Sequence, residues 1–110
     1  MNKLDLTNKP FIITLCGSVK FRHQFEEAAK SESLSGKIVI YPSFFSTEGL
    51  TEDEEIFLSN LHKRKIDISD EVLVINPKGY IGEHTANQIN YAMRKGLPVR
   101  YLKPPEKEGE

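Results

Sequence analysis

Four short apolar runs alternate along the chain with longer amphipathic segments. The runs are rich in β-branched residues and lie at residues 11–16, 37–41, 71–75 and 97–102. Uninterrupted apolar runs of this length are typical of parallel strands that are covered on both faces. The amphipathic segments predict helices at about residues 20–30, 51–69 and 85–95. This β-α-β-α-β-α-β order predicts an α/β fold: a small doubly wound parallel sheet, flavodoxin-like or Rossmann-like, with about four strands and helices on both faces.

The first predicted helix has a clear apolar face. Phe21, Phe25, Ala28 and Ala29 recur on that face, and Ser18 is a candidate cap. Residues 31–36 then read as a turn because they are rich in Ser and end in Gly.

The second and third predicted helices begin with capping signals. Thr51 and Glu54 match the capping box T-x-x-E, and Thr85 with Gln88 at the third helical position matches it again. The second helix has acidic residues in its first turn and basic residues near its end, which is the distribution that a helix dipole favours. The predicted buried stripe of the second helix consists of Ile56, Phe57, Leu61 and Ile68.

Two adjacent aromatic residues, Phe44 and Phe45, lie in the loop at residues 43–50. They line a ligand site or a subunit interface, or they fold back onto the core; the sequence leaves these alternatives open.

Length and charge limit the classes of function. The 110 residues make one domain, with a polar arm at 1–9 and a charged, flexible tail at 103–110. So short a chain buries only a modest core, and we therefore expect a homodimer or larger assembly.

The net charge of -1 provides no basic field for nucleic acid, and no apolar run approaches the ~20 residues of a membrane span. The lone Cys16 excludes an internal disulfide, and without a signal peptide we expect a cytoplasmic protein.

Two glycine-bearing loops follow the first and third predicted strands, at residues 16–20 and 76–85. Right-handed crossovers place these strands side by side at the topological switch point, so both loops open at the carboxyl edge of the sheet. Glycine lets the backbone approach a ligand, and a helix N-terminus offers free N–H groups. We therefore predict a phosphate or sugar site that includes Gly17 and Ser18, with Ser18 also serving as a cap.

Other polar residues are weaker candidates for chemistry. Asp70 precedes a strand and reads mainly as a turn residue that bonds local backbone. Glu83 is the carboxylate nearest to the third helix, and His62 would respond to pH near neutrality if it lay in the site. The sequence has no H-x-x-x-H or C-x-x-C pattern, so we expect no metal site.

Several stretches together resemble the nucleoside 2-deoxyribosyltransferase-like superfamily, which includes the 2'-deoxynucleoside 5'-phosphate N-hydrolases. They are ITLCGSVKF (13–21), HKRKIDISDEVLVINP (62–77), GYIGEHTANQINYA (79–92) and KGLPV (95–99). The resemblance implies a small parallel α/β fold, usually dimeric or larger, that cleaves the N-glycosidic bond of a deoxynucleoside or its monophosphate. It also implies that a glutamate attacks the anomeric carbon, as in retaining glycosidases, without a cofactor.

The resemblance assigns roles to individual positions. Gln88 occupies the place of the nucleophilic glutamate, and His62 falls near an aspartate that orients the sugar. Ser18 matches a serine that contacts phosphate, whereas Asp70 matches a residue of architectural type. The loop beside the sugar corresponds to Tyr80 and Gly82, and Thr85 opens the helix that follows.

Gln88 departs from the family pattern because a neutral amide is a far poorer nucleophile than a carboxylate. Two interpretations follow: an N-glycosidase or deoxyribosyltransferase in which Glu83 or another group replaces the nucleophile, or a nucleotide-binding sensor or regulator that keeps the pocket. A purely structural domain is a weaker third interpretation.

Overall fold

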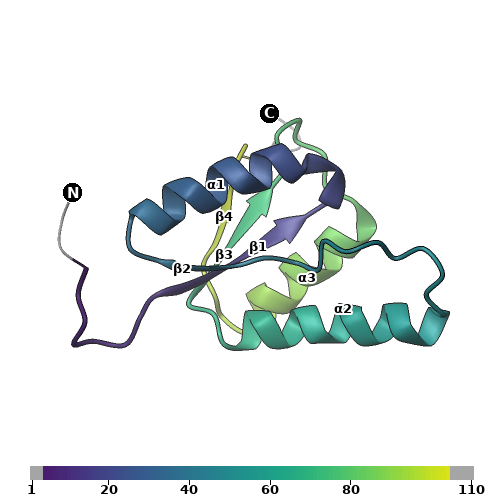
Figure 1. Cartoon of the computed structure of the whole chain (residues 1–110), viewed down its shortest axis with the longest axis horizontal. Helices are drawn as coiled ribbons and strands as arrows, with labels where there is room; N and C mark the ends of the chain where they lie inside the picture. Colours follow the sequence, from purple (N-terminus) through teal and green to yellow (C-terminus); the bar gives the residue numbers. More distant parts are fainter. Residues whose placement is uncertain (1–3, 105–110) are drawn as a thin grey trace.

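The computed structural model describes residues 4–104, which form one four-stranded sheet and three α-helices. The elements follow the predicted order (Figure 1): β1 (Ile12–Gly17), the 3-10 turn η1 (Val19–Phe21), α1 (Arg22–Leu34), β2 (Ile38–Ile40), α2 (Glu52–Asp67), β3 (Glu71–Ile75), α3 (Glu83–Arg94) and β4 (Val99–Tyr101). All strands pair in parallel, in the order β2-β1-β3-β4. The predicted α/β class and the adjacency of the first and third strands are therefore confirmed.

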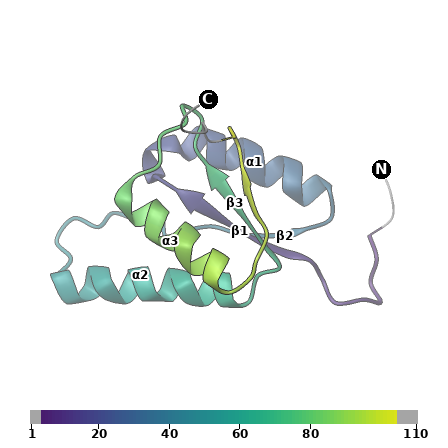
Figure 2. The same ribbon diagram turned by 180° about the vertical axis from the view of Figure 1, so that it is seen from behind.

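The sheet is covered on both faces. Helix α1 lies on one face, and α2 and α3 lie on the other (Figures 1 and 2). Successive side chains of β1 and β3 point to opposite faces of the sheet. They therefore contribute alternately to two apolar clusters, one on each face. The cluster under α1 contains Ile13, Leu15, Phe25, Ala28, Ala29, Leu73 and Ile75. The cluster under α2 and α3 contains Cys16, Ile66, Val72, Val74, Ile89 and Ala92.

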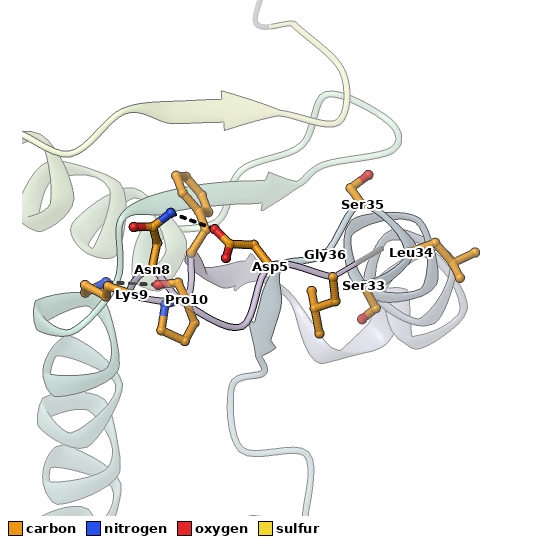
Figure 3. A pocket seen from close by; sticks show the side chains of 10 residues that line it. Asp5, Asn8, Lys9, Pro10, Ser33, Leu34, Ser35 and Gly36 are labelled. Atoms are coloured by element: carbon orange, nitrogen blue, oxygen red, sulfur yellow. Dashed lines mark hydrogen bonds between the residues drawn. The ribbon is translucent and has the colours of Figure 1, made fainter. Parts of the chain in front are cut away.

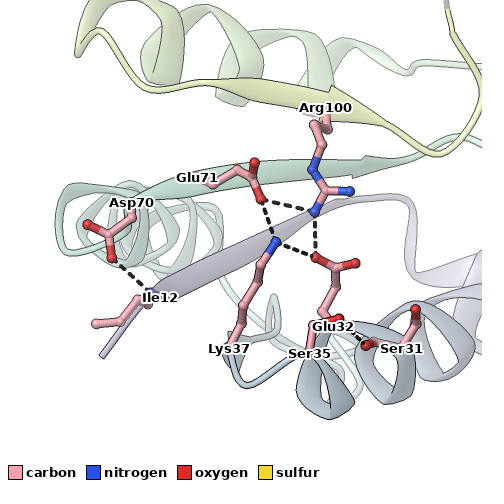
Figure 4. A network of polar contacts seen from close by, with 8 residues as sticks. All are labelled: Ile12, Ser31, Glu32, Ser35, Lys37, Asp70, Glu71 and Arg100. Atoms are coloured by element: carbon pink, nitrogen blue, oxygen red, sulfur yellow. Dashed lines mark hydrogen bonds and ion pairs between the residues drawn. The ribbon is translucent and has the colours of Figure 1, made fainter. Parts of the chain in front are cut away.

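Helix α1 continues to Leu34, through residues predicted to form a turn. Its last turn is tied to the sheet by Glu32, whose carboxylate accepts from Lys37 Nζ at 3.0 Å and from Arg100 (Figure 4). Both cations also contact Glu71. A tertiary ion network thus overrides the weak local helix preference of this Ser-rich segment.

The capping box of α2 is present, but its predicted apolar stripe is wrong. Thr51 Oγ1 accepts from the Glu54 N–H, and Glu54 accepts from the Thr51 N–H. The predicted stripe residues are exposed: Ile56, Phe57, Leu61 and Ile68. His62 and Ile66 are buried instead. In the views of Figures 1 and 2, the amino-terminal half of α2 runs past the strands, which explains why its apolar side chains find no cover.

The two phenylalanines after β2 separate. Phe44 folds back onto the core, edge-on to Phe25 and Tyr41 with ring centroids 5.0 and 5.2 Å apart. Phe45 remains exposed. The loop therefore adds one aromatic residue to the core and leaves one at the surface.

Both predicted flexible ends lie partly outside the described residues. The arm is described from Leu4 and the tail as far as Pro104. The start of the tail is held, because the buried Asn76 side chain donates to Lys103 O and accepts from Lys103 N, at 2.8 and 2.9 Å. Within residues 4–104, no helix has the length and apolar character needed to cross a membrane.

Candidate functional site

The loops after β1 and β3 meet at the carboxyl edge of the sheet. Gly17, which ends β1, pairs with Ile75, which ends β3. A Cβ on Gly17 would lie 2.8 Å from the Ile75 carbonyl oxygen, and the glycine has a φ of +154°. Close packing of the two strand ends therefore requires a glycine at this position, whether or not a ligand binds nearby.

Four residues form what we call the edge cluster: Ser18, Lys20, Tyr80 and Gly82. Ser18 Oγ accepts from the Lys20 N–H at 3.4 Å, so the predicted cap exists, although it caps η1. Lys20 Nζ lies 4.4 Å from the Tyr80 ring centroid, which joins the two loops by a cation–π contact. A Cβ on Gly82 would lie 3.1 Å from the Tyr80 hydroxyl. Lys20 was not among the site residues predicted from the sequence; its signal was a cation two residues after a Gly-Ser pair at a strand end.

Helix α3 begins two residues earlier than predicted. Gly82 is the N-cap and Glu83 the first helical residue, whereas Thr85 is buried as the third. The Gly82 carbonyl accepts from the Ala86 N–H at 2.9 Å, so the turn closes before Thr85. The second capping box is therefore wrong: Thr85 does not cap α3, and Gln88 is not at its third position. Glu83 lies exposed at the positive end of the helix dipole.

Gln88 lines a polar hollow of about 290 Å³ between α2 and α3, which we call the Gln88 hollow. Side chains from both helices surround it: Ser59, Lys63, His84, Asn87, Gln88, Asn90 and Arg94. None of these is a carboxylate. Ser18, His62, Tyr80 and Glu83 are not among the lining residues, so the structure places Gln88 apart from the edge cluster.

His62 is buried against Cys16 and only 4% exposed. Its Nε2 lies 3.3 Å from Cys16 Sγ, while Nδ1 has no hydrogen-bond partner within the described residues. Burial, with a smaller contribution from the charge of Lys65, lowers the pKa of His62 to about 4. Burial also raises the pKa of the Cys16 thiol to about 12. Both groups are neutral at pH 7. His62 lies in the core beside Cys16, so the condition for its expected response to pH near neutrality, a place in the site, is not met.

Asp70 lies at the opposite edge of the sheet. It accepts from the Ile12 N–H at 2.8 Å and pairs with Lys9 Nζ at 3.0 Å (Figure 4 shows the first contact). The hydrogen bond from Ile12, then that from Lys9, holds the pKa of Asp70 below its usual value. Asp70 thus positions β1 beside β3. This contact agrees with the interpretation of Asp70 as a turn residue that bonds local backbone, and Asp70 precedes β3, whereas the edge cluster follows the strands.

A larger hollow, of about 620 Å³, lies between the arm and the end of α1, and Figure 3 shows its lining. Its charged side chains are already engaged: Asp5 accepts from Thr7 and Asn8, and Lys9 pairs with Asp70. It therefore offers no free charged group to a ligand. Across residues 4–104, no three His, Cys, Asp or Glu side chains are grouped so as to hold a metal ion.

Comparisons with known proteins show the fold. No family model and no curated protein match the sequence. A solved 2-deoxyribosyltransferase from Leishmania mexicana superposes with a TM-score of 0.56 at 16% identity. A conserved protein from Enterococcus faecalis V583 superposes with a TM-score of 0.60 at 15% identity. Each match covers 84% of this chain and 63% of the other, so the chain spans less than two thirds of those proteins. The resemblance to deoxyribosyltransferase-like proteins is confirmed at the level of the fold.

Proposed function

We propose that this chain is a nucleoside- or nucleotide-binding protein built on the fold of the N-glycosidic-bond hydrolases and deoxyribosyltransferases. The observation that carries the proposal is the edge cluster. It joins the β1 and β3 loops at the switch point, where open parallel sheets bind ligands. The shared fold with the Leishmania mexicana protein supports the same ligand class.

The edge cluster supplies the groups that such a ligand needs. The Ser18 hydroxyl donates to a phosphate or sugar oxygen, and the Lys20 ammonium neutralises a phosphate. The exposed Tyr80 ring offers an apolar face to a sugar or base, and Gly82 leaves the space that the Tyr80 hydroxyl occupies.

Binding without catalysis is the function that the Gln88 hollow favours. Displacement at an anomeric carbon needs a carboxylate, because charge stabilises the oxocarbenium-like transition state. Gln88 carries no charge, and no acidic residue lines its hollow. We therefore propose a sensor or regulator that keeps the pocket and lacks the nucleophile.

Glu83 supports a second candidate, an active N-glycosidase or deoxyribosyltransferase. It is exposed and directly follows Gly82 of the edge cluster. In this mechanism the Glu83 carboxylate bonds to the anomeric carbon while the C–N bond breaks, and the departing base takes a proton from water. Water or a second base then displaces the carboxylate from the sugar.

Chromatography distinguishes the two candidates. The native chain, Gln88→Glu and Glu83→Gln are incubated with deoxynucleosides and their 5'-monophosphates, and released or exchanged base is measured. We expect no release by the native chain, and release by Gln88→Glu would show that position 88 reaches the sugar of the bound ligand. Release by the native chain that Glu83→Gln abolishes would instead establish the enzyme.

Calorimetry tests phosphate binding at the edge cluster. It should detect monophosphate binding that Ser18→Ala and Lys20→Gln weaken; unchanged affinity in both variants would remove the phosphate role.

A homodimer or larger assembly is part of the proposal. Phe57 and Leu61 on α2 and Ile68, the residue that caps its carboxyl end, are exposed at spacings that place them on one face of the helix. An uncovered apolar stripe of this kind supports contact with another protein surface, and we propose a second copy of the chain.

A further inference from the structure

The Gln88 hollow is lined only by polar side chains, and its fixed charges are positive. Ser59 and Lys63 face it from successive turns of α2, and Asn87 and Arg94 face it from positions two turns apart on α3. The acidic residues one turn earlier on each helix, Glu55 and Glu83, are not among the lining side chains. A concave site with two fixed cations and no carboxylate concentrates positive potential.

Lys63 and Arg94 differ from the cations beside them. Arg64 and Lys95 both pair with Asp67, at N–O distances of 2.7 and 3.3 Å. Lys63 lies instead over the Tyr91 ring, 5.7 Å from its centroid. In the part of the chain that the structure describes, neither Lys63 nor Arg94 has a carboxylate partner. Lys65 of α2 also has no carboxylate partner among the described residues, but its Nζ donates to the Tyr41 carbonyl at 2.9 Å and it does not line the hollow. Lys63 and Arg94 are therefore the cations without a carboxylate partner that line it.

Gln88 keeps the hollow positive. A glutamate at this position would compensate one of the two cations and repel an incoming anion. The amide instead offers two N–H donors, as do Asn87 and Asn90. Donors and cations without a competing acid are the groups that bind oxyanions.

We propose that the Gln88 hollow is an oxyanion site that holds a phosphate group, from inorganic phosphate or from a nucleotide. Lys63 and Arg94 supply the charge, and the carboxamides of Asn87 and Gln88 donate to the phosphate oxygens. The volume of about 290 Å³ leaves room for the anion and part of its hydration shell. The inference is independent of ligand binding at the edge cluster, because Ser18 and Tyr80 are not among the lining residues.

Titration with inorganic phosphate, followed by 1H–15N NMR at constant ionic strength with chloride as the reference, tests the site. We expect saturable shifts of the side-chain amide signals of Asn87 and Gln88. Lys63→Gln, Arg94→Gln and Gln88→Glu should each weaken phosphate binding by about tenfold, since each removes a charge-assisted contact or adds repulsion. Lys30→Gln, at an exposed position of α1, is the matched control and should bind as the native chain does.

The outcomes separate this inference from the proposed function. Saturable shifts at Asn87 and Gln88 that require Lys63 and Arg94 support it. If a deoxynucleoside monophosphate produces them and phosphate does not, the nucleotide is the source of the anion. Shifts confined to Ser18 and Lys20 would overturn the inference while leaving nucleotide binding at the edge cluster intact. Unchanged affinity in the Lys63→Gln and Arg94→Gln variants, or no saturable shift with either ligand, would also overturn it; the backbone spectrum of each variant reports that it is folded.

Discussion

At the scale of single residues, the contact between His62 and Cys16 shows how burial decides chemistry. In water the imidazole would titrate near neutral pH. Here it lies between α2 and the sheet, with Nε2 at the Cys16 thiol and Nδ1 without a hydrogen-bond partner among residues 4–104. Protonation would place a charge in an apolar cluster, so the neutral ring is favoured. His62 therefore acts as a packing residue near pH 7.

This burial predicts a dependence of stability on acidity. The unfolded chain protonates His62 below its ordinary pKa of 6.5, whereas the folded chain does so only near 4. Between these values the unfolded state binds more protons, so stability is lost as the pH falls from about 6.5 to about 4. The loss amounts to about 3 kcal/mol when complete. Urea unfolding at pH 7 and pH 4.5 measures it.

Two variants isolate the contribution of His62 from that of the carboxylates. His62→Gln should lower the free energy of unfolding at pH 7 but reduce its dependence on pH. His23→Gln, which changes an exposed histidine on α1, should retain the native dependence. An identical dependence on pH in His62→Gln and the native chain would show that His62 is not the group responsible.

At the scale of the elements, the two ends of α2 are stabilised differently: Ile66 packs in the core near the last turn, whereas the first turn is stabilised by the capping box. The apolar stripe predicted to pack α2 against the core is exposed. The capping box supplies hydrogen-bond partners to N–H groups at the start of the helix, which have none within it. Thr51→Ala should therefore lower the free energy of unfolding by about 1 kcal/mol. Thr47→Ala, in the exposed loop just before α2, should change it by less than about 0.5 kcal/mol. Thermal unfolding of both variants checks this, and equal losses would mean that the cap does not stabilise α2.

The sequence predicted those features that neighbouring residues determine. The capping box of Thr51 and Glu54 and the bounds of β3 follow from local chemistry and apolar periodicity, and the order of elements fixes a parallel sheet. The start of α3 was predicted wrongly because Gly82 and Thr85 both signal a cap, and the backbone closes at Gly82. The end of α1 depends on Arg100 and Glu71, which are distant in sequence.

The candidate site was less predictable for the same reason. Gly17, Ser18, Tyr80 and Gly82 follow strand ends, so topology alone brings them to one edge. The Gln88 hollow instead requires knowing which faces of α2 and α3 meet, and periodicity does not show what covers a helix face. His62 illustrates the limit: the resemblance placed it near a residue that orients the sugar, whereas its environment is core.

At the scale of the whole molecule, the chain is more extended than its length requires. Its radius of gyration is 14.7 Å, whereas a compact domain of this size has about 13 Å. The arm and the exposed end of α2 project from the two layers around the sheet (Figure 1). A projecting helix with an uncovered apolar face is better suited to an assembly than to an isolated monomer.

The charges of α2 favour one arrangement of two copies. Its first turn is acidic throughout, whereas Arg64 and Lys65 lie in its last turn. Two α2 helices that pack antiparallel across a two-fold axis would place each acidic end beside the basic end of the other and bury both stripes of Phe57, Leu61 and Ile68. A parallel arrangement would set like charges together.

Light scattering after size exclusion tests this dimer. The native chain should have twice its 12.5 kDa mass at high concentration, and Phe57→Glu should shift it to the monomer, because a buried unpaired carboxylate is costly. Ile56→Glu is the matched control: Ile56 is comparably exposed, at 52% against 68% for Phe57, but points about 100° away around the helix. That variant should remain dimeric. A native mass of 12.5 kDa would refute the dimer, and equal dissociation by both variants would refute the antiparallel stripe as its interface.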